Sequence, residues 1–386
     1  MAYDLAIVGA GPAGAAAALT ARLVAPDADV VLLERAAFPR DKPCGDALSP
    51  DAVAELAKLG AAGTVQGFAP VERLRLRSPG GIEVVDAPPA IGYVVPRLVF
   101  DERLASAARD TGIDWRQATV RGVDPAGDRV TLQTSAGDMT ARAVIGADGA
   151  NSVVRRGLTG AAPAARHMGV AVRGYAPAPG GPRELHLIWE AADALAYAWS
   201  FPIDDRRCNV GYGVFGTATP PRRAHLVERM TALLSNASSV DSVRGHRLPL
   251  SSGGARLGAG RVLLAGDAAS LINPLTGEGI YYALLSGRLA ASAALRSPGA
   301  PSSAYRATLY AALGAHLRST RWLARLAAKP RVLDQLVRAA SASPATLELL
   351  ADLAFGKGTL APVTALTLAG GLARSLPSRA TPRRTT

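Results

Sequence analysis

The stretch Tyr3-Asp-Leu-Ala-Ile-Val-Gly-Ala-Gly-Pro-Ala-Gly-Ala-Ala-Ala-Ala18 decides the fold, because a short apolar run leads directly into three closely spaced glycines. Residues 3–8 predict a buried strand, and the alanine-rich segment that continues to about Val24 predicts a helix. A second apolar run, Asp29–Leu33, ends in Glu34. Strand, glycine turn, helix and strand in this order indicate a βαβ unit.

The glycine pattern of this unit is typical of a dinucleotide site, although an ordinary glycine turn is the alternative. Gly9 permits the tight turn, Gly11 lets the backbone approach a pyrophosphate, and Gly14 lets the helix pack on the strand. The helix N-terminus then presents its amides to the phosphates. Glu34 lies 20 residues beyond Gly14, where its carboxylate can accept both hydroxyls of an unphosphorylated ribose. This pattern favours FAD.

A second motif, Gly146-Ala-Asp148-Gly149, follows a strand predicted at 142–146. An aspartate at a strand end can order a loop over a pyrophosphate, but an Asp-Gly turn without a ligand explains the motif taken alone.

The third motif is Gly266-Asp267 after a strand predicted at 261–265, followed by Asn273-Pro-Leu-Thr-Gly277-Glu-Gly279-Ile280. The aspartate can bond ribityl hydroxyls. The glycines then open a helix whose N-terminus can face the flavin ring and support negative charge there. A capping loop is the alternative.

The composition excludes several other classes. The chain has 386 residues, a formal charge of +12, two cysteines and a slightly positive mean hydropathy. It shows no nucleic-acid module, no disulfide framework and no metal-ligand spacing. We expect no signal peptide, because the first strand begins at about Tyr3, and no spanning helix, because the uncharged run 358–373 is short and contains proline and glycines. A cytoplasmic protein is predicted.

The expected fold class is α/β (α+β overall): a Rossmann-like FAD-binding domain with an inserted antiparallel β-sheet substrate domain and C-terminal helices. Alternating segments and turns predict strands between about 70 and 95 and between 167 and 214, and 97–109 predicts a helix. The predicted divisions are a discontinuous FAD-binding domain (1–69, 96–160 and 255–300), a β substrate domain (70–95 and 161–254), a helical region (301–375) and a disordered tail (376–386).

The three motifs in this order resemble the para-hydroxybenzoate-hydroxylase-fold flavoproteins, which include hydroxylases, halogenases and reductases. Two further strings, Arg40-Asp-Lys-Pro-Cys-Gly-Asp-Ala-Leu-Ser-Pro50 and Tyr197-Ala-Trp-Ser-Phe-Pro202, resemble the geranylgeranyl reductase family, and the first is similar to bacterial reductases of the menaquinone prenyl tail. Members of that family reduce isoprenoid C=C bonds. Two positions depart from its pattern: Ala194 stands where the family has proline, and Ala47 where many relatives have glycine.

The resemblance implies specific site residues. FAD contacts are implied at Gly14, Glu34, Cys44, Gly45, Ala47, Arg97, Asp267, Gly279 and Ile280, and at Val120 in the strand after Trp115. With the motif positions, the predicted cofactor set adds Gly9, Gly11, Ala13, Arg35, Asp148, Gly266 and Gly277. The predicted catalytic residues are Cys44, Asp46, Tyr197 and Trp199. The predicted substrate contacts are Tyr197, Trp199, Phe201 and Pro202.

The aromatic string also has a physical interpretation of its own. Alternate side chains of a strand share a face, so Tyr197, Trp199 and Phe201 point the same way and could line a slot for an apolar chain. Pro202 would end the strand at the cavity edge. A core stripe is the alternative, just as a buried structural thiol is the alternative for a catalytic Cys44.

The predicted function is FAD-dependent reduction of isoprenoid C=C bonds by hydride from flavin N5. A flavin monooxygenase of a specialised metabolite and a non-catalytic prenyl or quinone carrier are the alternatives. No second dinucleotide fingerprint is visible, so NAD(P)H would bind transiently or another reductant would replace it. The expected partner is a hydrophobic or lipid substrate. Arg318, Arg321, Arg325, Lys329 and Arg331, with Trp322 and leucines, could rest on an anionic membrane or form an ordinary solvated helix.

Overall fold

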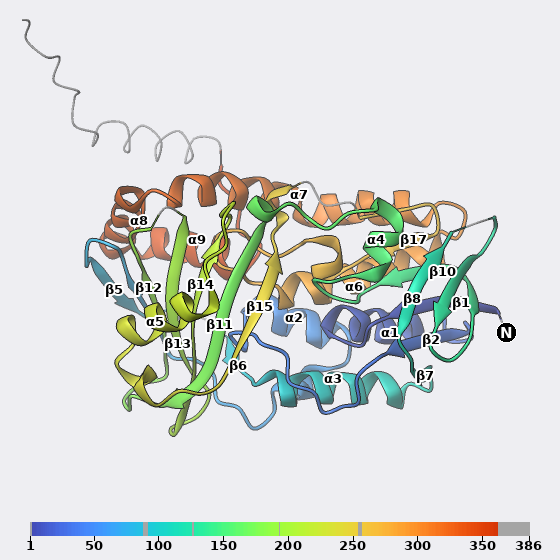
Figure 1. Ribbon diagram of the computed structural model, residues 1–386, viewed down its shortest axis with the longest axis horizontal. Helices are drawn as coiled ribbons and strands as arrows, with labels where there is room; N and C mark the ends of the chain where they lie inside the picture. The colour runs from blue at the N-terminus through green and yellow to red at the C-terminus, as the bar shows by residue number, and fades with distance from the viewer. Residues whose placement is uncertain (1, 88–91, 126, 193, 254–256, 362–386) are drawn as a thin grey trace, which may run out of the picture.

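The computed structural model (Figure 1) describes residues 2–87, 92–125, 127–192, 194–253 and 257–361. The strands around the predicted βαβ unit are β1 (Ala2–Val8), β2 (Val30–Glu34), β7 (Asp114–Gln117), β8 (Val120–Asp124), β9 (Val130–Thr134), β10 (Met139–Gly146), β16 (Gly258–Ala259) and β17 (Val262–Leu264). The remaining strands are β3 (Ala47–Leu48), β4 (Arg73–Arg77), β5 (Glu83–Asp86), β6 (Tyr93–Val94), β11 (Met168–Pro177), β12 (Glu184–Trp189), β13 (Leu195–Pro202), β14 (Arg207–Phe215) and β15 (Asp241–Pro249). The α-helices are α1 (Pro12–Val24), α2 (Pro50–Lys58), α3 (Arg97–Asp110), α4 (Val153–Thr159), α5 (Arg223–Leu233), α6 (Ile280–Arg296), α7 (Pro301–Ala327), α8 (Pro330–Ala342) and α9 (Pro344–Phe355).

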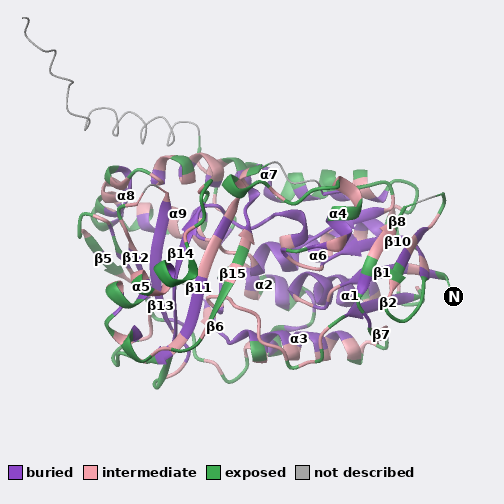
Figure 2. Ribbon diagram, in the orientation of Figure 1, coloured by how far each residue is buried: buried purple, intermediate pink, exposed green. Residues whose placement is uncertain are grey.

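The first sheet runs in the order β16-β17-β10-β1-β2-β7 within the described residues, with β9 and β8 extending from β10. Its central strands pair in parallel, as the βαβ pattern requires. β2 is buried throughout and the last four residues of β1 and of β10 are buried, because helices cover both faces of the sheet there (Figure 2). The parallel order places the carboxyl ends of β1, β2, β10 and β17 at one edge.

The turn after β1 depends on glycine at two positions. Gly9 has φ +96°, a conformation that an L side chain rarely adopts. A Cβ on Gly14 would lie 1.7 Å from the Gly9 carbonyl oxygen, so only glycine lets α1 begin this close to the strand. The alanine-rich α1 is buried over most of its length and packs against α6.

The second sheet runs in the order β15-β11-β14-β13-β12-β4-β5 within the described part of the chain. The predicted antiparallel pairing holds for all its neighbours except β12 and β4, which are parallel. β4 comes from the earlier segment near residue 75, and it joins the sheet beside β12 together with β5, which forms the edge. One face of this sheet packs on the C-terminal helices, and the other face is covered by α5.

A buried polar network attaches the C-terminal helices to the rest of the molecule. The Tyr282 hydroxyl of α6 lies 2.7 Å from Nε2 of His316 on α7, whose Nδ1 lies 2.7 Å from the Gly358 carbonyl oxygen. Asn273, in the loop before α6, donates to the Leu353 carbonyl oxygen at 2.9 Å. These bonds fix the end of α9 against the loop that opens α6.

The predicted α/β fold class is confirmed, and the strands and helices expected from the motifs lie close to their predicted bounds. The domain divisions at the stated residues remain a prediction. The predicted tail 376–386 and the end of the helical region, 362–375, lie outside the described residues. Across the described ranges no helix is long and apolar enough to cross a bilayer.

Candidate functional site

Two adjoining cavities lie where the two sheets meet. The glycine-lined cavity, with about 1630 Å³ of empty volume, lies at the carboxyl ends of the first sheet's strands. The aromatic cavity, with about 990 Å³, lies between this edge and the second sheet. The two cavities share the lining residues Pro12, Lys42, Pro43, Arg97, His246, Asp267 and Ala283. They therefore form one continuous cleft.

Glu34 closes the outer end of the glycine-lined cavity. It is the last residue of β2 and only 6% exposed. Its carboxylate accepts the Ala10 amide at 2.8 Å and the Ala36 amide at 2.9 Å. These bonds hold the carboxylate beside the glycine turn, where its free lone pairs can accept ribose hydroxyls.

The middle of this cavity suits an anion. Gly11 is the N-cap of α1, and a Cβ there would meet only Nη2 of Arg40, at 3.4 Å, so the helix N-terminus is open to a ligand. Asp148 lines this cavity, and its Oδ2 accepts the Val153 amide at 2.6 Å at the start of α4, so it orders the loop after β10. Its Oδ1 is buried with no hydrogen-bond partner among the described residues.

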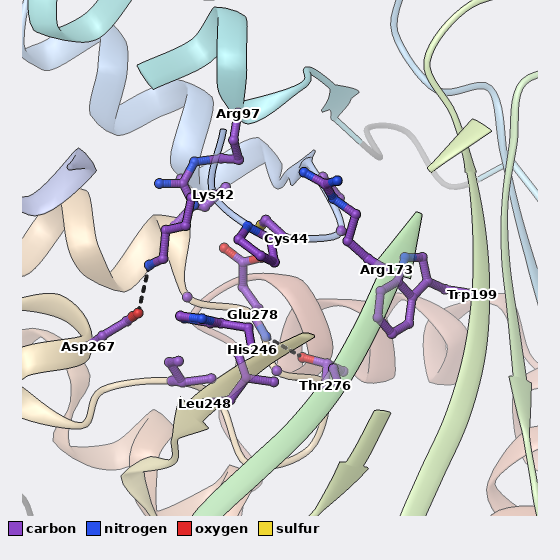
Figure 3. A pocket seen from close by; sticks show the side chains of 18 of the residues that line it. Lys42, Cys44, Arg97, Arg173, Trp199, His246, Leu248, Asp267, Thr276 and Glu278 are labelled. Atoms are coloured by element: carbon purple, nitrogen blue, oxygen red, sulfur yellow. Dashed lines mark hydrogen bonds and ion pairs between the residues drawn. The ribbon is translucent and has the colours of Figure 1, made fainter. Parts of the chain in front are cut away.

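Lys42 and Asp267 meet across the boundary between the two cavities. The ammonium lies 2.9 Å from the carboxylate, and Figure 3 shows the two side chains reaching toward each other. Burial alone would raise the pKa of Asp267, but Lys42 and His246 lower it below the ordinary value. If the ion pair with Lys42 opened, the Asp267 carboxylate could accept hydrogen bonds from ribityl hydroxyls. The neighbouring His246 has its pKa lowered to about 4, mainly by burial, and its Nε2 is buried with no hydrogen-bond partner in the described part of the chain.

Cys44 lies in the loop between β2 and β3 and lines the aromatic cavity. Burial raises the pKa of its thiol, although the nearby Arg97 opposes the shift. Arg97, a predicted cofactor contact, is 3% exposed and lines both cavities. Its guanidinium donates to both carboxylate oxygens of Asp101.

Asp46 lies behind the cavity wall. It is fully buried and accepts hydrogen bonds from Asn209 Nδ2 at 2.7 Å, the Tyr175 hydroxyl at 3.0 Å and the Arg97 amide at 3.3 Å. Burial raises its pKa to about 6, while Arg173 and these donors oppose the shift. Asp46 is therefore placed to position its neighbours and does not line the cavity.

Asn209 connects the cysteine loop with the aromatic strand. Its amide nitrogen also donates to the Cys44 carbonyl oxygen at 2.8 Å, and its oxygen accepts the Trp199 indole N–H at 2.8 Å. One side chain on β14 thus fixes the indole, the Cys44 backbone and the Asp46 carboxylate together. Sequence reasoning missed it because nothing local distinguishes an asparagine within a strand.

The predicted aromatic face on β13 lines the cavity. Tyr197 stacks on Phe215 with ring centroids 5.3 Å apart, and Trp199 lies between Tyr197 and Phe201. The Tyr197 hydroxyl donates to the Thr276 carbonyl oxygen. These rings belong to the core cluster that the second sheet forms with the C-terminal helices, so the lining and core interpretations both hold. β13 ends at Pro202, which does not line the cavity.

Glu278 projects into the aromatic cavity from the loop before α6. Its Oε1 accepts the Tyr281 amide at 2.9 Å, and no basic side chain in the described ranges forms an ion pair with it. Burial raises its pKa to about 7, against the backbone amides and Arg97. Figure 3 shows its carboxyl group directed toward Cys44. The residue lies inside a quoted motif, but its role was not foreseen, because the pattern drew attention to the flanking glycines.

A third space, the leucine chamber, adjoins the aromatic cavity and has about 570 Å³ of empty volume. Both spaces are lined by Thr276 and Phe355. The chamber lies between the second sheet and helices α7–α9. Its other lining residues are Leu74, Leu76, Leu187, Trp189, Leu275, Leu323, Leu333, Leu336, Val337, Leu350, Ala351 and Ala354. The chamber therefore lies next to the aromatic cavity, and its lining is almost entirely apolar.

The structure brings most of the predicted site residues into this cleft. In the glycine-lined cavity lie Gly9, Gly11, Ala13, Glu34, Arg35, Arg97, Val120, Asp148 and Asp267. In the aromatic cavity lie Cys44, Gly45, Ala47, Tyr197, Trp199, Phe201, Gly277, Gly279 and Ile280. Gly14 and Gly266 instead support the packing of α1 and α6, and Asp46 and Pro202 line neither cavity. The individual roles remain predictions.

The cleft fits an extended dinucleotide with a planar ring system. It offers a carboxylate for ribose, an open helix N-terminus beside Arg40 for a pyrophosphate, and a second carboxylate, Asp267, toward the aromatic end. Beyond Asp267 the lining becomes apolar and aromatic, as a ring system and an apolar substrate would need. A Rossmann-like sheet with this cleft at its carboxyl edge is typical of dinucleotide-binding proteins, and the aromatic end of the cleft favours a flavin dinucleotide.

Comparison with known proteins places the chain within this class. The sequence profile described as "FAD binding domain" matches residues 2–285, and the chain belongs to this family. The menaquinone reductase of Mycobacterium tuberculosis is 36% identical over 309 residues, 75% of each chain. A digeranylgeranylglycerophospholipid reductase of Methanoculleus marisnigri is 31% identical, over 76% of each chain. A geranylgeranyl bacteriochlorophyll reductase-like protein of Thermoplasma acidophilum shares the fold, with a TM-score of 0.77 at 21% identity over 98% of this chain and 97% of that chain.

Proposed function

We propose that the protein is an FAD-dependent oxidoreductase that reduces C=C bonds of an isoprenoid chain. The observation that carries the proposal is the cleft itself: the cavity suited to FAD is continuous with a cavity lined by aromatic rings, and an apolar chamber adjoins that cavity. Two relatives that are more than 30% identical over three quarters of the chain are named as reductases of a prenylated quinone and of a geranylgeranyl lipid.

The residues that would hold FAD are those of the glycine-lined cavity, with Glu34 at the ribose and Gly11 at the pyrophosphate. Bound and reduced, FAD supplies a hydride equivalent to the alkene. The chain's own contribution is to orient the alkene and exclude water, which matters because an isolated alkene is a poor hydride acceptor. Trp199, held by Asn209, and Tyr197, held by Thr276, form a rigid wall for this purpose.

The aromatic cavity and leucine chamber favour an extended apolar substrate over a compact polar one. Their walls are largely leucine and aromatic side chains. Burial of each CH₂ group contributes about 0.8 kcal/mol, so an isoprenoid chain along this path gains affinity from its length. A small hydroxylation substrate would leave the chamber unfilled.

The electron donor is proposed to be NAD(P)H acting transiently, or another reductant. Among the described residues one glycine-rich strand-turn-helix unit of the dinucleotide type is present, and its cavity is assigned to FAD. A donor would then approach from outside and leave before the alkene is reduced.

We also propose contact with the cytoplasmic face of a membrane, where such substrates reside. Arg318, Arg325, Lys329 and Arg331, named here the basic row, are exposed at the end of α7 and the start of α8. The leucines of this region, such as Leu323, are buried in the core, so the contact would be electrostatic and would not insert an apolar helix face.

Lipid analysis of cells with and without the protein tests this function. Each saturated bond adds two hydrogens, so we expect quinones or membrane lipids of the producing cells to be heavier by two mass units per reduced bond. Unchanged lipids, together with NAD(P)H-driven oxygen uptake by the pure protein, would support a monooxygenase instead.

A further inference from the structure

The loop that carries Glu278 and the loop that carries Cys44 both pack against the aromatic face. A Cβ on Gly277 would lie 2.8 Å from the Phe215 ring and 3.8 Å from the Tyr197 hydroxyl. A Cβ on Gly45 would lie 3.3 Å from the Phe201 ring. Glu278 is therefore carried on a loop that contacts the wall against which an apolar substrate would lie, and its side chain is directed toward Cys44 (Figure 3).

Alkene reduction needs a proton as well as a hydride, and the other polar groups of the aromatic cavity are poorly suited to donate one. Asp267 is ion-paired with Lys42. The Tyr197 hydroxyl proton is committed to the Thr276 carbonyl, and burial raises the pKa of Tyr197. His246 is neutral at physiological pH, because its pKa is lowered to about 4.

Three cationic side chains of the lining are ion-paired: Lys42 with Asp267, Arg97 with Asp101 and Arg173 with Asp41. Among the described residues of the lining, Cys44 and Glu278 remain as candidate acids. Burial raises the pKa of the Cys44 thiol above its ordinary value, which makes it a weak acid at neutral pH. Glu278 has a carboxyl group without an ion pair, and burial raises its pKa to about 7, where an acid both holds and releases a proton. The charged or titratable groups that act on it or respond to it are Arg97, Tyr197 and Tyr282.

We propose that Glu278 is the catalytic acid that protonates the alkene. This inference rests on the proposed function. The alkene takes a hydride, with its two electrons, from the reduced flavin on one carbon and a proton from Glu278 on the other. The π bond breaks, two C–H bonds form, and the flavin is left oxidised. The Glu278 carboxylate then regains a proton from water once the product leaves.

A purely structural role for Glu278 makes a different prediction. Its Oε1 caps the first turn of α6 by accepting the Tyr281 amide. The amide oxygen of glutamine can accept the same bond, so Glu278→Gln preserves the cap and removes only the acid. Glu278→Asp keeps an acid on a shorter side chain. Glu190→Gln is a matched control, because Glu190 bonds Tyr212 and Arg229 outside the cleft.

The first test reads the protonation state without turnover. Infrared spectra of the protein between pH 5 and 9 should contain a carboxylic acid component that titrates near pH 7, beside the component from Asp46, whose pKa is about 6. The component near pH 7 should be absent from Glu278→Gln and present in Glu190→Gln, and the Asp46 component should remain in both. A spectrum of Glu278→Gln identical to that of the wild type would overturn the assignment.

The second test is a single turnover of anaerobically reduced protein with a geranylgeranyl lipid. For wild type we expect flavin reoxidation that slows as pH rises through about 7, because the acid loses its proton. Glu278→Gln should slow reoxidation by roughly 100-fold or more, and its rate should no longer fall as pH rises through about 7. Quenching of tryptophan fluorescence by the lipid should persist, which shows that the variant still binds it. Glu278→Asp should retain partial activity, with the fall in rate at a different pH, and Glu190→Gln should match wild type.

The outcomes separate the two claims. Glu278→Gln reacting within threefold of wild type would overturn the acid role and leave the reductase function standing. If the fall of the reoxidation rate with pH persists in Glu278→Gln but disappears in Cys44→Ser, the Cys44 thiol is the catalytic acid instead. Wild-type flavin that no isoprenoid reoxidises would overturn the proposed function, while the infrared band still reports whether Glu278 holds a proton.

Discussion

Glu34 and Asp46 are both buried carboxylates, yet their surroundings give them different tasks. Glu34 is bound by two backbone amides at the edge of a cavity, so it remains available to a further ligand. Asp46 accepts from Asn209, Tyr175 and the Arg97 amide inside the protein, and it lines neither cavity of the cleft. The sequence indicated Glu34 because its spacing from Gly14 is local. It could not reveal the partners of Asp46, which lie more than 100 residues away in two of the three cases.

Glu34→Gln should weaken FAD binding without unfolding the protein. Glutamine keeps one acceptor for the backbone amides but loses the charge that strengthens bonds to ribose hydroxyls. Hydrogen bonds to charged groups contribute about 1.5–3 kcal/mol, so we expect the Kd for FAD to rise roughly 10- to 100-fold. Titration of apoprotein with FAD measures this. An unchanged Kd would contradict the ribose assignment.

Asp46→Asn should remove a pH-dependent component of stability. The folded pKa of Asp46 is raised by burial to about 6, above its ordinary value of 3.8, so the folded state holds the proton more tightly. The stabilisation is complete below the unfolded pKa and is lost as pH rises through about 6, and it amounts to at most about 3 kcal/mol. Denaturant unfolding of the apoprotein should therefore show that the free energy of unfolding declines less between pH 4 and pH 7 for Asp46→Asn than for wild type.

Glu55→Gln is the control of opposite sign. Burial alone would raise the pKa of Glu55, but Arg288 and Lys58 bring it below the ordinary value. The stabilisation that ionised Glu55 gives the folded state is present at neutral pH and lost on acidification. Glu55→Gln should therefore be less stable than wild type mainly above the pKa that Glu55 has in the unfolded chain. If Asp46→Asn and Glu55→Gln changed the pH profile in the same direction, the burial argument for Asp46 would be wrong.

At the level of elements, the βαβ unit was predictable because its glycines and apolar runs are adjacent in sequence. The aromatic strand β13 was predictable from its alternation, which places three rings on one face. The parallel pairing of β4 with β12 was not, because it depends on a long crossover from an earlier segment. The hydrogen bonds of Asn209 on β14 were not predictable either, because they depend on the register between β13 and β14.

Gly211→Ala tests how β14 positions the aromatic wall. A Cβ on Gly211 would lie 2.1 Å from the Trp199 ring, so alanine must displace the indole into the cavity. Overpacking of this kind costs about 1–3 kcal/mol of stability. We expect FAD binding to survive and isoprenoid reduction to fall at least tenfold, measured as flavin reoxidation. Gly245→Ala, on β15 of the same sheet with its nearest contact at 3.7 Å, should behave like wild type.

At the scale of the whole molecule, α7 to α9 close the inner end of the cleft and present the basic row on the outside. The same helices bury their leucines, so one face lines the leucine chamber while the other can meet an anionic surface. Cofactor cavity, substrate path and membrane contact would then lie along one molecule in that order.

The basic row predicts salt-dependent binding to anionic vesicles. Each basic residue near an anionic membrane contributes about 1 kcal/mol, so Arg318→Glu with Arg325→Glu should lower affinity roughly tenfold or more at low salt. Vesicle co-sedimentation measures this, and raised salt should release the wild type. Arg206→Glu, an exposed substitution in the β13–β14 turn, is the control. Equal binding by all three proteins would exclude the basic row as the contact.

The central claim is that reduced flavin in this cleft passes its electrons to an isoprenoid double bond. The most direct measurement mixes anaerobically reduced protein with a geranylgeranyl lipid that contains no quinone, because a quinone ring could reoxidise the flavin by itself. The account predicts that the oxidised flavin spectrum returns without oxygen and that the lipid gains two mass units per bond reduced. Flavin that stays reduced across a panel of geranylgeranyl and other prenyl lipids would contradict it.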